Sequence, residues 1–181
     1  MPLLMALSFI ACQPRDDSPK PAVIGSPQEL TVKLTRMLEL LPSNDASPPP
    51  NQGSLQQFIQ EVLPDAQKVQ SLLRDDTRNA NLGTYYATEL RPSALRELPW
   101  ALKEAKRQGL SRIEISRVGP QAGSSNAHGD LALLEQLNQR DGLYTVRFHR
   151  EGLDKGLRLS GWLFLEDKGW ICLLKLGEEI K

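Results

Sequence analysis

The sequence predicts an α+β fold in which N-terminal helices pack on a curved antiparallel sheet of about four strands. Apolar residues recur at helical spacing in the first part of the chain, up to Gly109, and at every second position in the strand segments predicted between Arg112 and Leu176. Short loops join the last three predicted strands, so an antiparallel meander is the simplest pairing. Helices followed by strands in this way indicate one α+β domain.

The composition excludes several classes of protein. The 181 residues suffice for one domain with tails, and a hydrophobic fraction of 40% provides a core and argues against disorder throughout. The 22 basic side chains balance the 22 acidic ones, so no uniform field attracts nucleic acid and no nucleic-acid partner is expected. Two cysteines, Cys12 and Cys172, are too few for a disulfide scaffold or a cysteine-based zinc module.

The first predicted element is an amphipathic helix over residues 27–41. Ser26 is its expected N-cap, with Glu29 three residues later in a capping-box pattern. A proline-rich linker follows the helix, so the sequence divides into a tether over residues 13–53, which includes the helix, and an α+β domain over residues 54–181. The helix either docks on that domain or binds a partner.

Further helices are predicted between the linker and the first strand. Ser54 is the expected N-cap of the next helix, and Pro64 divides the apolar pattern into two short helices that meet at a bend. More helical segments follow, and the last of them bends near Pro99 and ends at Gly109. This part of the chain is therefore expected to be mostly helical.

The sheet begins after these helices. Residues 112–116 alternate as a strand does, and a loop over residues 119–129 follows. Asp130 is the expected N-cap of a short leucine-rich helix that ends at Asn138, and residues 143–150 form the next strand. We expect both strands to belong to one sheet.

The strand predicted over residues 157–165 is apolar on both faces towards its end. Its leucines are expected on one face, and Arg158, Ser160, Trp162 and Phe164 on the other. A sheet covered on one face only would carry polar residues there, so a cover over Trp162 and Phe164 is expected. The cover is either the N-terminal helix or another part of this chain, or a ligand or partner subunit. Trp162, Phe164 and Arg158 are therefore a candidate partner or ligand surface.

Residues 1–12 (MPLLMALSFIAC) are uncharged and apolar, but too short to span a bilayer, and they suit the core of an export signal. The run Phe9-Ile10-Ala11-Cys12 resembles the lipobox of bacterial lipoproteins. The resemblance implies cleavage before Cys12, a lipid attached to Cys12 and an extracytoplasmic place in a bacterial cell envelope, with the outer membrane as one location. The alternative is an N-terminal apolar helix that packs on the domain.

Cys172 alternates with Trp170 and Leu174 in the last predicted strand, so we expect it to be a small buried hydrophobe. If Cys12 is acylated, Cys172 has no intramolecular partner. The alternative is a Cys12–Cys172 disulfide, which would tie a flexible tail to a core strand.

The end of the chain carries a second resemblance. A strand that closes with Gly161-Trp162, a turn, and then Lys168-Gly169-Trp170 is similar to the end of nuclear-transport-factor-two-like and cystatin-like domains. The resemblance implies a curved sheet wrapped around a helix, with a cone that some members use as a pocket. It carries over no catalytic residue.

No arrangement of residues indicates catalysis or a cofactor. His128 and Asp130 form an H-x-D pair, but His149 is the only other histidine, and no metal site is expected. Ser124 and Ser125 lack the surroundings of a nucleophile, and the loop lacks a phosphate-binding pattern.

The sequence therefore favours a lipid-anchored binding or scaffolding domain without a recognisable catalytic site. Its partners are expected to be the membrane, through the lipid, and a protein or a small apolar ligand. The alternative is a small pocket enzyme of the ketosteroid-isomerase type. The polar candidates for such a pocket are Tyr85, Tyr86, Tyr144 and Asp141.

Overall fold

The computed structural model describes residues 23–41, 52–76, 79–119, 128–138, 142–152 and 156–179. The helices are α1 (Pro27–Leu40), α2 (Gln52–Val62), α3 (Ala66–Leu72), α4 (Leu82–Tyr85), a π-helix (Tyr86–Leu90), α5 (Arg91–Arg107), α6 (His128–Gln136) and a C-terminal 3₁₀ helix (Leu176–Glu179). The strands are β1 (Arg112–Arg117), β2 (Tyr144–His149), β3 (Leu157–Leu165) and β4 (Gly169–Cys172). They form an open antiparallel sheet in the order β1-β2-β3-β4, which confirms the α+β prediction.

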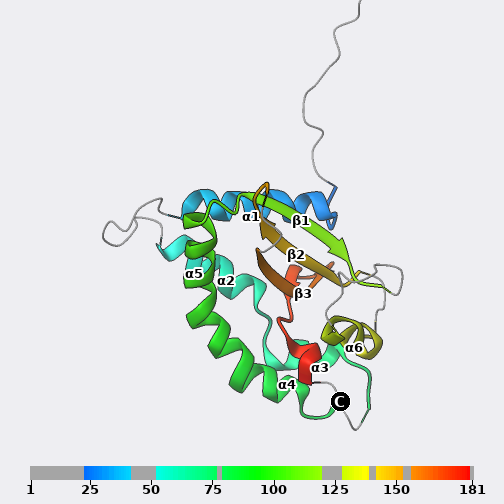
Figure 1. Cartoon of the computed structure of the whole chain (residues 1–181). Helices are drawn as coiled ribbons and strands as arrows, with labels where there is room; N and C mark the ends of the chain where they lie inside the picture. Colours follow the sequence, from blue (N-terminus) through cyan, green and yellow to red (C-terminus); the bar gives the residue numbers. More distant parts are fainter. Residues whose placement is uncertain are drawn as a thin grey trace, which may run out of the picture.

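Helices cover both faces of this sheet. On one face, α1, α2 and α5 bury their apolar sides against residues such as Phe148 and Trp170, and we call this cluster the first core (Figure 1). On the other face, α3, α4 and α6 pack with residues such as Leu163 and Ile171 in the second core. The last helix of the chain, red in Figure 1, lies beside α6. The second core covers only one end of its face, so the fold leaves part of the sheet open.

α1 begins as the sequence predicts. The Ser26 hydroxyl accepts a hydrogen bond from the Glu29 amide at 3.2 Å, and the Glu29 carboxylate accepts one from the Gly25 amide at 2.6 Å. Its apolar stripe is fully inside the first core: Leu30, Leu34, Met37, Leu38 and Leu41. α1 is therefore built into the first core, which is one of the two alternatives that the sequence leaves open for this helix. Linker composition predicts a break in the chain, but not where the helix before the break packs.

The next helices keep the predicted bend but not the predicted cap. α2 already begins at Gln52, so Ser54 lies inside its first turn and is not an N-cap. The helical structure is interrupted at Pro64. The Asp65 carboxylate then accepts a hydrogen bond from the Lys68 amide at 2.7 Å and caps α3. The two short helices that the sequence predicts on either side of Pro64 are therefore present.

A bulge in β3 changes which side chains share a face. Gly161 has a φ of +79°, and the pairing of β2 with β3 shifts register between Tyr144 and Val146. One extra residue inverts the alternation of the strand. As a result, Leu157 and Leu159 lie on the face of Trp162 and Phe164 in the first core, while Leu163 and Leu165 lie in the second core. The expectation of four leucines on one face is wrong for this reason.

Several sequence predictions fall outside the described residues. Among them are Cys12, Ser124, Ser125, Asp141 and the side chain of His128. Within the described ranges, no helix has both the length and the apolarity needed to cross a membrane.

Candidate functional site: a groove between α5 and β3

A groove of about 480 Å³ runs between one side of α5 and the first half of β3. Apolar side chains dominate its lining, and several of them are only partly buried by the protein itself: Leu90, Leu98, Leu157, Leu159 and Leu174. The volume is in the range of small-ligand sites. The groove is therefore a concave apolar surface that is open to solvent.

Polar side chains line the rim of the groove in pairs. The Glu97 carboxylate accepts a hydrogen bond from the Ser93 hydroxyl at 2.7 Å, and Lys175 lies 3.7 Å from the Glu178 carboxylate. With Arg158, the two carboxylates and two basic groups of the lining sum to no net charge. An apolar floor with a nearly neutral rim suits an uncharged, largely apolar ligand.

Arg158 forms part of the wall on the β3 side, and a buried carboxylate holds it there. Asp130 of α6 is 5% exposed at its side chain, and its Oδ2 lies 2.5 Å from Arg158 Nη2, 3.1 Å from the Thr145 hydroxyl and 3.5 Å from the Ser160 hydroxyl. Asp130 therefore ties α6 to β2 and β3. The prediction that Asp130 is an N-cap is wrong, because α6 begins at His128 and the Asp130 side chain turns to the sheet.

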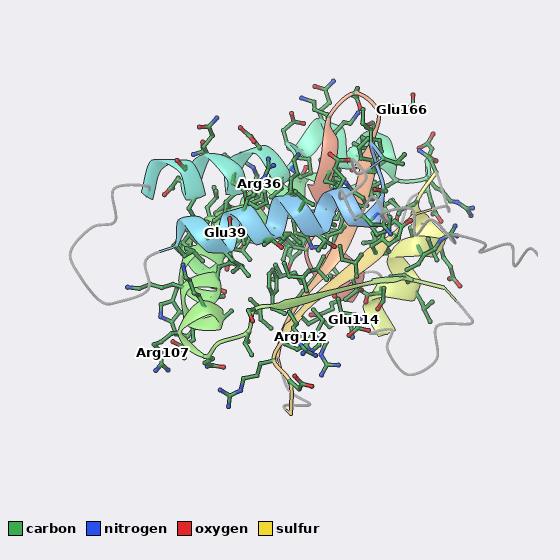
Figure 2. The ribbon with its side chains drawn as sticks, turned by 90° about the horizontal axis from the view of Figure 1, so that it is seen from above. Arg36, Glu39, Arg107, Arg112, Glu114 and Glu166 are labelled. Atoms are coloured by element: carbon green, nitrogen blue, oxygen red, sulfur yellow. The ribbon has the colours of Figure 1, made fainter. Side chains whose placement is uncertain are left out.

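The part of the sheet beyond this cluster carries charged side chains. Arg147 lies opposite Glu114 on β1 and opposite Arg158 on β3. Figure 2 shows Arg112 and Glu114 on β1. The two arginines are like charges on neighbouring strands, and each also has a carboxylate neighbour, Glu114 across from Arg147 and Asp130 bound to Arg158. This part of the sheet is therefore a solvated face, in contrast to the apolar groove.

The structure separates the three residues of the predicted surface. Trp162 is 2% exposed and lies in the first core. Phe164 is partly exposed, and a Cβ atom added at Gly25 would lie 2.8 Å from its ring, so the segment before α1 covers it. Arg158 alone of the three lines the groove. The cover over Trp162 and Phe164 thus comes from this chain.

The tyrosines proposed for an enzyme pocket lie in different surroundings and none of them lines the groove. The Tyr86 hydroxyl donates to the Cys172 carbonyl oxygen at 3.1 Å, and burial raises its pKa. Tyr144 packs edge-on against Trp170, with ring centroids 5.5 Å apart. Desolvation, together with the nearby Glu179, raises the pKa of Tyr85. In the described part of the chain, no three His, Cys, Asp or Glu side chains gather where they could hold a metal ion.

Comparison with protein-family models, with curated proteins and with solved structures finds no match. The fold class therefore rests on the structure itself.

Cys172 is expected to be unreactive while the protein is folded. The side chain is 1% exposed, and burial raises the pKa of its thiol to about 12, so at pH 8 only about one thiol in ten thousand is thiolate. We expect no labelling of the folded Cys12→Ser variant by a thiol reagent over the time that labels the urea-unfolded protein completely. Labelling of the folded variant at the rate of a free thiol would contradict the burial of Cys172.

Asp130→Asn is expected to destabilise the protein. The substitution keeps the shape of the side chain but leaves the Arg158 guanidinium without its counter-ion. Loss of one partner of a fully buried ion pair costs about 3–5 kcal/mol of stability. Since the Arg158 side chain is 35% exposed, we expect the free energy of unfolding, measured in urea, to fall by about 2 kcal/mol.

The matched control is Glu151→Gln. This carboxylate lies 2.7 Å from Arg112 Nη2, but both side chains are exposed, so we expect a loss below about 0.5 kcal/mol. Equal losses in the two variants would mean that Asp130 acts as an ordinary surface charge.

Proposed function

We propose that this protein is a lipid-anchored extracytoplasmic domain that binds an apolar ligand or partner segment in the groove between α5 and β3. The observation that carries the proposal is the groove itself, a solvent-open surface with leucines from α5, β3 and the C-terminal segment. Exposed apolar surface is unfavourable in water unless a ligand covers it, and large apolar concavities commonly mark binding sites. The fixed position of Arg158 gives one wall of the site a defined shape.

The lipid anchor rests on the sequence of residues 1–12 and on the lipobox-like run that ends at Cys12. Burial of acyl chains in the bilayer stabilises attachment by about 0.8 kcal/mol for each buried CH₂. The anchor would keep the domain at the surface of a membrane in the bacterial envelope, where the groove meets partners outside the cytoplasm.

The anchor is tested by mass spectrometry of the protein expressed in bacteria from its own N-terminus, compared with Cys12→Ser. We expect a wild-type mass that lacks the residues before Cys12 and includes a lipid, and a membrane fraction that holds the protein. The Cys12→Ser variant should lack the lipid. A wild-type chain that keeps its first residues and stays in the cytosol would overturn this part of the proposal.

The groove is tested separately with the fluorescent probe 8-anilinonaphthalene-1-sulfonate. Ala101 lines the groove from α5, so Ala101→Glu places a charge on the apolar floor and should weaken probe binding about tenfold. Gln56→Glu makes the same charge change at an exposed position of α2 and should bind as the wild type does. Equal binding by all three proteins would show that the groove is not the apolar binding site.

A further inference from the structure

β3 extends past the end of β4 and leaves part of its edge open. β4 pairs with Trp162 to Leu165 only. Beyond this pairing, the Leu173 amide donates to the Gly161 carbonyl oxygen at 2.7 Å, and the Cys172 thiol donates to the Ser160 carbonyl oxygen at 3.3 Å. The chain then turns away at Leu174, whose φ is +57°. In the described part of the chain, residues 157–160 therefore have β2 as their only strand neighbour.

The groove meets β3 along this open edge. Leu157, Arg158, Leu159 and Ser160 all line it, although successive side chains of a strand point to opposite faces. Four consecutive lining residues place the groove beside the strand rather than above one face of it. Backbone N–H and C=O groups of a strand point alternately to its two sides, so about half of those in this stretch face the groove.

The dimensions of the groove fit one extended segment. Its α5 wall runs from Ser93 to Ala101 and is about 12 Å long at 1.5 Å per residue. A strand of about four residues covers the same length at 3.3 Å per residue. The floor offers apolar contacts to alternate side chains of such a strand, while Arg158 and Ser160 face its other side chains.

We propose that the groove binds an extended segment of a partner protein, with alternating apolar and polar residues, that pairs with residues 157–160 as an added strand of the sheet. The inference rests on the proposed function, since it names the class of ligand that the groove takes. The open backbone edge favours a peptide over a small apolar molecule, which leaves the edge unpaired. α5 forms the opposite wall, so a lone strand fits there, whereas the edge of a second folded copy would bring further strands against α5.

Trp100 lies at the margin of the groove and can signal binding. It is 70% exposed on α5, one turn from Glu97 and next to Ala101, both of which line the groove. Tryptophan is frequent among the residues that dominate binding energy at interfaces. The other two tryptophans, Trp162 and Trp170, are buried in the first core, so a change in the emission of exposed tryptophan reports on Trp100.

The probe is a capped peptide of alternating valine and threonine with a lysine at each end for solubility. Two matched peptides carry N-methyl groups, one on the valine amides and one on the threonine amides. In a strand these two sets of amides point to opposite sides, so only one set faces β3. We expect the parent peptide to shift the Trp100 emission to the blue. One methylated peptide should bind at least about tenfold more weakly, because its hydrogen bonds to β3 are lost, and the other should bind as the parent does.

The controls separate this inference from the proposed function. Trp100→Phe should remove the signal, and Ala101→Glu should weaken binding while Gln56→Glu does not. Equal binding of both methylated peptides would overturn strand addition and leave an apolar groove. If no peptide binds but the fluorescent dye still binds and Ala101→Glu still weakens that binding, strand addition is overturned and the apolar groove is not. If sedimentation shows a dimer of the chain and Ala101→Glu dissociates that dimer, the groove binds a second copy, and the proposal of a partner peptide is overturned.

Discussion

A chain that lacks α1 is expected to lose its cooperative unfolding transition. Removal of residues 1–41 takes away the apolar stripe of α1 and exposes the surface of the first core against which it packs: Leu30, Leu34, Met37, Leu38 and Leu41 are the stripe residues. Burial of each such side chain contributes about 1.5–3 kcal/mol. Their sum is close to the whole stability of a typical domain, about 5–15 kcal/mol. Urea titration, monitored by circular dichroism, measures the loss of the unfolding transition.

A graded pair of variants tests the same point in the full chain. Leu34 is 1% exposed, and Leu34→Ala should cost about 2–5 kcal/mol because it leaves a cavity in the first core. Arg36, labelled on the same helix in Figure 2, is exposed, and Arg36→Ala should change stability by less than about 0.5 kcal/mol. A truncated chain that unfolds with the wild-type midpoint would show that α1 is a separable arm.

The sequence predicted the elements of this fold better than their packing. Local signals define α1, since Ser26 and Glu29 make the cap hydrogen bonds that the capping-box pattern indicates. Period-two alternation likewise defines β2, whose even-numbered residues lie in the first core. Where α1 docks depends on contacts with residues far along the chain, such as those of β1, and no local pattern encodes them.

The groove was harder to predict for two physical reasons. The alternation rule assumes an unbroken strand, so the bulge at Gly161 reversed the faces on which the candidate surface of Trp162, Phe164 and Arg158 was based. The open edge of β3 depends on where the chain turns away after β4, at Leu174 in the left-handed region, a residue type that does not signal such a turn. Gly161, in the middle of an apolar strand, is the one local signal of the bulge that the sequence offers.

Gly161→Ala is expected to destabilise the sheet strongly. A Cβ atom at this position would lie 2.5 Å from the Leu174 carbonyl oxygen and 3.0 Å from the Leu174 amide nitrogen, so backbone atoms have to move. The left-handed φ adds about 1–2 kcal/mol of strain for alanine, and with the steric clash we expect a loss of about 3–5 kcal/mol. Thermal and urea unfolding measure it.

Gly109→Ala separates the two causes, because Gly109 has a similar φ of +72° and no atom within 4 Å of an added Cβ. It should therefore show the conformational strain alone, about 1–2 kcal/mol. Equal losses at the two glycines would mean that the contact between β3 and Leu174 is loose. Since Leu174 also lines the groove, Gly161→Ala should weaken the binding of the fluorescent probe under conditions where the variant is still folded, whereas Gly109→Ala should leave that binding unchanged.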